Sequence, residues 1–232
     1  INPVPQSPMT DHPIRPAFWN VPLWGEIGVY VLGFTAVALL IAGILRNRHL
    51  WLRGAEDPHP VKDRRARLFS VIADVFTQKK IRETSAGRLH AVLAWGFFLL
   101  FCGTALATLD WDVGHYVFDA QFLQGGFYLA YKFVLDCAGI AVLIALALGA
   151  ARRWSKESGL PGDARFVCAY LSLAFIVLTG FLVEGIRLAA TLPAWSVYSP
   201  IGHLVAKMLL ACGLSEAELR LLHTWIWTIH GI

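Results

Sequence analysis

Residues 87–107 read GRLHAVLAWGFFLLFCGTALA, and no Asp, Glu, Lys or Arg follows Arg88 within them. A helix of about 20 apolar residues is long enough to cross the hydrocarbon core of a membrane. Similar apolar runs occupy residues 22–45, 122–150 and 166–190, and a fifth begins near Leu221. The sequence therefore predicts an all-α integral membrane protein that folds as a bundle of five transmembrane helices.

The composition indicates lipid rather than water as the surrounding solvent. Of the 232 residues, 56% are hydrophobic and only 16% are charged, whereas soluble domains carry about 25% charged residues. The cysteines are Cys102, Cys137, Cys168 and Cys212. They form no CxxC pair, so we expect buried thiols rather than ligands of zinc or of an iron–sulfur cluster.

The loop charges predict the orientation of the helices. Residues 46–88 hold eleven of the twenty Lys and Arg residues, whereas residues 109–121 have three Asp and no Lys or Arg. Because basic loops face the cytoplasm, we expect residues 46–88 to form a cytoplasmic loop and the N-terminus to lie outside. This distribution also explains the net charge of +4, so we expect no nucleic-acid partner.

The basic loop contains the stretch ARLFSVIADVFTQKKI, residues 66–81. Its mixture of apolar and basic residues fits an amphipathic helix that lies on the membrane surface. It fits equally well a segment that docks a soluble partner, or a connecting loop that only obeys the charge rule.

The two ends of the chain differ in character. Residues 1–21 begin with a polar, proline-rich stretch, and we expect an exposed tail ahead of a transmembrane domain over residues 22–232. Ser215 opens an S-x-x-E capping box, so the fifth helix should begin at the next residue. Its apolar part, residues 221–232, covers only about 18 Å. Because a chain does not end inside the membrane with unpaired carbonyls, we expect this helix to be truncated and the polypeptide to continue past Ile232.

Two histidines lie in the fifth apolar run. His223 and His230 are seven residues apart, so they share one helix face and lie about 10 Å apart along the axis. Both therefore cannot be axial ligands of one iron; a bis-histidine haem needs one histidine from each of two facing helices. His90 is the candidate on another helix. It lies about 10–15 Å from His230 in depth, so its own partner is expected beyond residue 232, or at His49.

The alternative to a ligand role is that these are packed, hydrogen-bonded histidines. Gly96 and Gly103 lie on the same helix as His90, where small residues leave room for a flat macrocycle. His115 and His203 fall in loops that are expected on the outer side, and we assign them a structural role.

Two charged pairs also lie within apolar runs. Lys132 and Asp136 are four residues apart and Glu184 and Arg187 are three apart, so each pair lies on one helix face. Such residues are costly in a membrane and indicate function, although ion pairs that only join helices are the alternative. Hydrogen-bond donors and titratable groups beside an apolar slot suit quinone chemistry. The aromatic residues expected to line this slot are Tyr128 and Tyr131.

Four strings in this order resemble a known family. They are RPAFWNVPLWGE (residues 15–26), HAVLAWGFFLLFCGT (90–104), FLQGGFYLAYKFVLD (122–136) and GFLVEGIRLA (180–189). Together with five helices and histidines on the second and fifth, they resemble the cytochrome b (gamma) subunit of respiratory nitrate reductase and its relatives. The strings resemble most the membrane domains of bacterial electron-transfer-flavoprotein:quinone oxidoreductases, which are related to heterodisulfide reductase.

The resemblance implies two b haems stacked across a bacterial inner membrane. His90 matches the inner ligand on the second helix, and His230 matches the outer ligand on the fifth; His223 is a further cofactor-binding candidate. The nitrate reductase pattern has a second histidine on the second helix where this chain has Leu100, which leaves the outer haem without an assigned second ligand. Either His230 pairs with an unusual partner, such as His203 or His115, or the outer haem is absent. Lys132 falls near a lysine that those relatives keep at the quinol site.

The resemblance also implies the partners. We expect a membrane haem b module, one or two haems, that passes electrons from a cytoplasmic iron–sulfur protein or domain, and an electron-transfer flavoprotein, to quinone. The iron–sulfur clusters are expected downstream of these residues or on another chain. The alternatives are a subunit that oxidises quinol for a terminal reductase, a haem-free membrane anchor for a soluble redox complex, and a transporter that uses the charged pairs.

Overall fold

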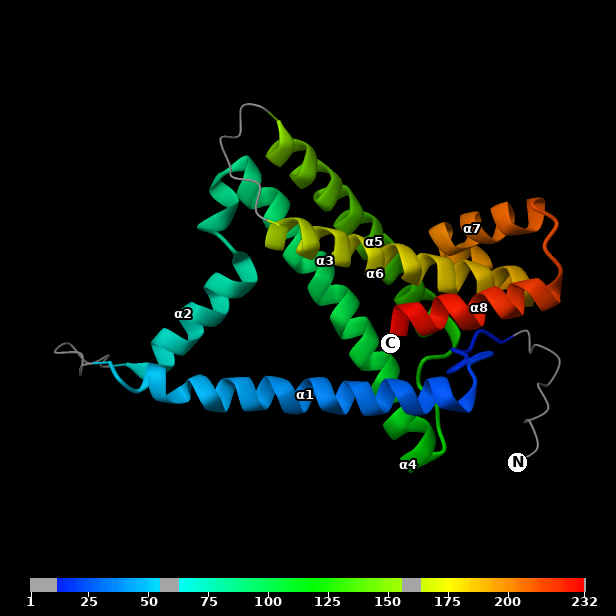
Figure 1. Ribbon diagram of the computed structural model, residues 1–232, viewed down its shortest axis with the longest axis horizontal. Helices are drawn as coiled ribbons and strands as arrows, with labels where there is room; N and C mark the ends of the chain where they lie inside the picture. Colours follow the sequence, from blue (N-terminus) through cyan, green and yellow to red (C-terminus); the bar gives the residue numbers. More distant parts are fainter. Residues whose placement is uncertain (1–11, 55–62, 156–163, 232) are drawn as a thin grey trace.

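The computed structural model describes residues 12–54, 63–155 and 164–231. Within these ranges every regular element is a helix, and the one β-bridge joins Ile14 to Gln124. Four helices are long and apolar enough to cross a membrane: α1 (Leu23–Trp51), α3 (Ser85–Thr108) with its extension to Phe118, α5 (Gly125–Trp154) and α6 (Ala164–Thr191). They confirm the all-α class and agree with a multi-pass helical membrane protein (Figure 1).

The last part of the chain folds as two shorter helices. The first, α7 (Pro200–Ala211), follows a 3-10 turn η3 (Ala194–Tyr198) and packs against α6. Sequence reasoning had treated this stretch as an outer loop and missed α7. The second, α8 (Glu216–Gly231), has 16 residues and packs along α6, so the expected fifth span remains a prediction.

Local signals explain where α8 begins. The Ser215 backbone N–H donates to Glu218 Oε2 at 2.8 Å, and the Glu218 N–H lies 3.4 Å from Ser215 Oγ. This reciprocal capping box satisfies backbone donors that the first turn leaves unpaired. The predicted start of the helix is confirmed.

Glycines set how closely α3 and α5 approach. A Cβ on Gly96 would lie 2.5 Å from Val142 Cγ2, and one on Gly103 would lie 2.5 Å from Leu135 Cδ2. These two positions, which sequence reasoning left open for a macrocycle, are therefore filled by α5 side chains. Helix–helix contact through small residues is a general feature of membrane bundles.

The π-helical segment η2 (Leu109–His115) continues α3, and the single turn α4 (Tyr116–Phe118) follows it. Asp110 is fully buried there and accepts bonds from the Phe122 and Leu123 N–H groups at 2.7 and 2.8 Å. The chain thereby turns from α3 into α5. Segments with π geometry are frequent at functional sites.

Most of the described part of the expected N-terminal tail packs against the bundle, and only His12 and Ile14 at its start are exposed. The Arg15 N–H donates to the Leu123 carbonyl at 3.0 Å, which fixes one end of residues 12–20 to the loop before α5. Asn20 Nδ2 donates to the Arg220 carbonyl on α8 at 2.7 Å, which fixes the other end. Trp19 between them is only 9% exposed. Among the described residues the expected exposure holds for His12 and Ile14 but not for residues 15–20, because proline-rich composition does not reveal long-range pairing; residues 1–11 lie outside the described ranges.

The helices α1 and α2 (Arg64–Thr77) lie at the edge of the bundle (Figure 1). On α1, the Tyr30 hydroxyl donates to Asp112 Oδ1 at 2.5 Å, but no residue in the most apolar window of the helix is buried. The helix α2 confirms that the basic loop contains a helix, and a 3-10 turn η1 (Ile81–Glu83) joins it to α3. None of the α2 residues is buried, so the surface of α2 could face either lipid or a soluble partner.

Candidate functional site

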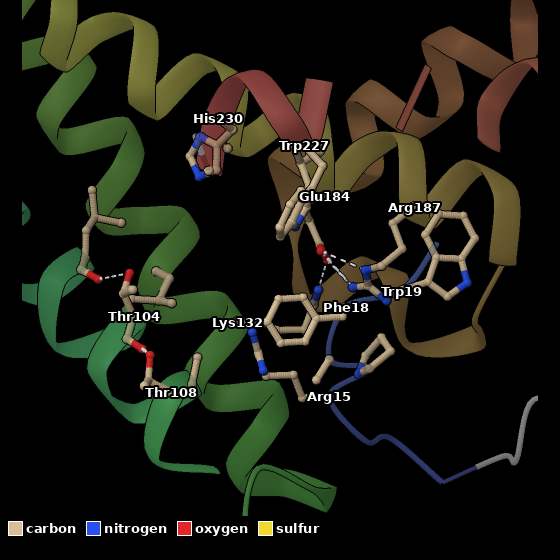
Figure 2. Close-up of a pocket in the computed structure, with 18 of the residues that line it drawn as sticks. Arg15, Phe18, Trp19, Thr104, Thr108, Lys132, Glu184, Arg187, Trp227 and His230 are labelled. Atoms are coloured by element: carbon tan, nitrogen blue, oxygen red, sulfur yellow. Dashed lines mark hydrogen bonds and ion pairs between the residues drawn. The ribbon is translucent and has the colours of Figure 1, made fainter. Parts of the chain in front are cut away.

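A cavity of about 690 Å³ lies where the N-terminal segment, α1, α3, α5, α6 and α8 meet. Its walls are mostly apolar, with a few charged side chains that enter from different helices. Six residues that the sequence singles out line it: Tyr128, Lys132, Asp136, Glu184, Arg187 and His230. Figure 2 shows four of them, Lys132, Glu184, Arg187 and His230. Tyr131 and His223 complete the predicted set at this cavity.

The centre of the charged set is one carboxylate with two cations. Glu184 Oε1 accepts a bond from Lys132 Nζ on α5, and Arg187 Nη2 lies 2.7 Å from both Glu184 oxygens (Figure 2). Lys132 is 6% exposed and Arg187 is 7% exposed. We call these three residues the ion cluster. Because its members come from α5 and α6, the ion cluster joins the two helices at the cavity.

Asp136 serves a different contact from the one its spacing indicated. Sequence spacing placed it beside Lys132 on one helix face, whereas its carboxylate accepts from Ser199 Oγ at 3.1 Å and from the Ile201 N–H at 2.8 Å. These bonds fix the start of α7 to α5. Lys132 pairs instead across to Glu184.

Aromatic rings surround the ion cluster. Tyr128 is 3% exposed, and its ring centroid lies 5.5 Å from Lys132 Nζ. Trp195 from η3 lies 5.3 Å from the same nitrogen and 5.8 Å from the Arg187 guanidinium carbon. Cations over aromatic faces are stabilised in desolvated sites. The Tyr131 hydroxyl donates to the Gly103 carbonyl at 2.9 Å, which ties α5 to α3.

The two α8 histidines both line this cavity, as their shared helix face predicted. His223 is 2% exposed and meets Trp19 edge to face, with ring centroids 4.7 Å apart. His230 lies nearer the end of α8, with Nδ1 2.9 Å from Thr179 Oγ1 on α6. A Cβ on the neighbouring Gly180 would lie 3.3 Å from the His230 ring.

His90 lies elsewhere. Its side chain is exposed near the start of α3 and takes no part in lining the cavity. The structure therefore places His90 and His230 at different sites. This agrees with the difference in depth that the helical rise predicts for them. His49, the alternative partner for His90, lies on α1 with Nδ1 2.6 Å from the Arg46 carbonyl.

The cavity was tested for the haem that the family resemblance implies. His223 and His230 stand on one helix, and the α3 wall presents Leu100, Thr104 and Thr108 (Figure 2). Hydroxyl and alkyl groups do not complete bis-histidine ligation. Among the described residues the cavity thus offers ligands from one side of an iron only, and these residues do not fit a bis-histidine haem. No group of three or more His, Cys, Asp or Glu side chains able to hold a metal ion occurs in the described ranges.

Several residues at the cavity carried no role in the sequence reasoning. Arg15, Phe18 and Trp19 enter it from the N-terminal segment, and Trp111 and Asp112 enter it from η2. The string that contains the first three was noticed only as part of a resemblance. Trp111 lies in the π-helical segment η2, and a short π-helical segment leaves no periodic pattern of apolar residues by which the sequence could have indicated it.

Fold and site together fit a multi-pass helical membrane protein, with a buried ion cluster beside an aromatic-lined cavity. The chain is similar to the EtfAB:quinone oxidoreductase of Syntrophomonas wolfei subsp. wolfei, with 28% identity over 233 residues. The match covers 95% of this chain and 31% of the relative, so the chain spans about a third of that protein's length. No family model matches the chain, and no solved structure matches it.

Proposed function

We propose that this chain is the membrane module of a quinone-linked electron-transfer oxidoreductase, and that the cavity holds the quinone ring. The observation that carries the proposal is the ion cluster, Lys132, Glu184 and Arg187, inside an apolar and aromatic cavity among helices able to span a membrane. Charged groups within membrane segments mark functional sites by default. An apolar cavity with a few converging polar groups is the usual form of a small-molecule site.

The chemistry of a quinone matches these groups. Reduction of a quinone to a quinol adds two electrons and two protons, so negative charge develops on the carbonyl oxygens. Lys132 and Arg187 bring two positive charges against the one carboxylate of Glu184. The net positive charge of the ion cluster stabilises an oxygen that gains electrons, because preorganised charges act strongly in a water-poor site. Glu184 is the titratable group closest to both cations.

The name of the similar protein supports a quinone-linked role for this module. It is named an EtfAB:quinone oxidoreductase, so we infer that electrons reach this module from an electron-transfer flavoprotein through iron–sulfur clusters outside the present residues, and pass to quinone. The strings that resemble nitrate reductase gamma subunits agree with a five-span module in a bacterial inner membrane. We assign the basic loop to the cytoplasmic side, where the donor would dock.

Substitution of Lys132 tests the quinone site. Lys132→Met keeps the length of the side chain but removes the charge, and we expect weaker binding of a menaquinone analogue together with slower quinone reduction. A hydrogen bond from a charged donor contributes about 1.5–3 kcal/mol, so affinity should fall roughly 10- to 150-fold. Isothermal titration of the full-length protein with the analogue measures this. Lys207→Met on α7, outside the cavity, is the control, and equal affinity in Lys132→Met and wild type would contradict the proposal.

The proposed quinone module has two forms, one with haem b, as the family resemblance implies, and one without haem; Leu100 favours the form without haem. This residue stands at the cavity where the nitrate reductase pattern has a ligand histidine. A reduced-minus-oxidised visible spectrum of wild type, His90→Ala and His230→Ala separates the candidates. The haem b module predicts a b-type band that weakens in either variant, whereas a folded protein without any band supports the haem-free module.

A further inference from the structure

The His223 ring is buried in the cavity wall without a hydrogen-bond partner in the described part of the chain. It is 2% exposed, and its Nδ1 is enclosed and unpaired. Its contact with Trp19 is an edge-to-face ring contact, with an angle of 83° between the rings, and supplies no acceptor. No hydrogen bond to the described residues therefore occupies the ring, and its other nitrogen is available to a ligand in the cavity that the ring lines.

The two ring nitrogens have different surroundings. Nδ1 is closed off by protein, and the ring lines the cavity, so we infer that Nε2 is the nitrogen that a ligand there can reach. An enclosed N–H without an acceptor is rarer than an acceptor left unused, so the proton belongs on Nε2. The ring is 2% exposed, and burial in a water-poor site disfavours a positive charge on it. His223 therefore presents a neutral N–H donor to the cavity.

We propose that His223 donates a hydrogen bond from Nε2–H to one carbonyl oxygen of the quinone, while the ion cluster contacts the other. This inference rests on the proposed function of the cavity. A quinone ring carries carbonyl oxygens on opposite sides, and the two donors stand on different helices, α8 for His223 and α5 with α6 for the ion cluster. Two separate donors fix the orientation of the ring. His223 is thus a binding residue that keeps its proton, and not an iron ligand.

Isotope-edited infrared spectroscopy tests this assignment. The full-length protein is loaded with a naphthoquinone analogue that carries ¹³C at either one carbonyl or the other, so that each C=O stretch is followed by itself. In His223→Leu, one labelled stretch should move toward its frequency in free quinone while the other stays. Affinity should fall about five-fold, which corresponds to one neutral hydrogen bond of about 1 kcal/mol.

Two conservative variants separate a donor role from a packing role. The amide nitrogen of Gln in His223→Gln reaches about as far as Nε2, whereas that of Asn in His223→Asn reaches only about as far as Nδ1. We expect Gln to restore the shifted carbonyl stretch and Asn to leave it as in the Leu variant. Comparison of His223→Gln with His223→Asn separates the donor role from the packing role even if His223→Leu impairs folding. His203→Gln on α7 is the matched control. The His203 Nδ1 lies 3.0 Å from Ser196 Oγ, and His203 does not line the cavity.

The outcomes are distinguishable. Carbonyl stretches that stay unchanged in all three His223 variants overturn the inference and leave the quinone site intact. No bound-quinone signal in wild type overturns the proposed function, and the inference with it. Loss of a b-type haem band in His223→Gln assigns the ring to an iron and also overturns the inference.

Discussion

Glu184 accepts bonds from both Lys132 and Arg187, so one carboxylate compensates two buried cations. Removing one partner of a buried ion pair leaves charge without compensation in a medium of low dielectric constant, and costs far more than the pair itself contributes. The ion cluster therefore contributes to stability as well as to ligand binding. Its effect on stability can be measured without any ligand.

Glu184→Gln should lower the free energy of unfolding by about 3 kcal/mol, the lower end of the range for a broken buried pair. The Gln oxygen still accepts one hydrogen bond, but both cations lose their counter-charge. Thermal unfolding in detergent, with no quinone added, measures the change. Glu216→Gln is the matched control: its pair with Arg220 is largely exposed, so the loss should stay below about 1 kcal/mol. Equal losses in the two variants would contradict this account of the ion cluster.

Among the elements, close helix contacts depend on glycine at particular points. On α6, a Cβ on Gly185 would lie 2.4 Å from Val205 Cγ1 and 3.2 Å from the Gly202 carbonyl of α7. The approach of α7 to α6 thus needs a residue without a side chain. It also holds η3 and the start of α7 where Ser199 and Ile201 bond to Asp136.

Gly185→Ala should lower the free energy of unfolding by about 1–3 kcal/mol through overpacking, although Ala favours the helix more than Gly does. Gly33→Ala on α1 is the control, since a Cβ there meets no atom within 4 Å; it should leave stability unchanged or slightly higher. The double variant Gly185→Ala with Val205→Ala should recover only part of the loss, because it removes Val205 Cγ1 but leaves Val205 Cβ 2.5 Å from the new methyl group. Chemical unfolding curves of the three variants check this, and a similar loss in Gly33→Ala would exclude steric overlap as the cause.

On the scale of the whole molecule, the positive-inside rule predicts that the basic loop is cytoplasmic and that residues 109–121 lie outside. Labelling of introduced cysteines from outside the cell tests this orientation. Single cysteines at Ser70 on α2 and at Ala120 before α5, in a background without the four native thiols, report the two sides. An impermeant maleimide added to intact cells should label Ala120→Cys and not Ser70→Cys. After the cells are lysed, both should react, because both positions are exposed. The reverse pattern in intact cells would invert the proposed topology.

Sequence patterns predicted what depends on local composition. The four long apolar helices, the start of α8 after Ser215, and the shared face of His223 and His230 follow from hydropathy, capping and helical period. Patterns within one helix placed Lys132 beside Asp136, whereas the partner is Glu184 on another helix. The contact between Trp19 and His223 joins residues about 200 positions apart. No local period encodes such pairings, since they arise only when the helices pack.

The contact between the N-terminal segment and α8 has a consequence for synthesis. Asn20 and Arg220 are 200 residues apart, and a ribosome adding about 5–20 residues per second needs roughly 10–40 s to make that length. During this interval the N-terminal segment, Lys132 and Glu184 have been made, but the α8 wall of the cavity has not. The cavity is therefore completed only after the ribosome has made α8, long after the N-terminal segment that α8 holds in place.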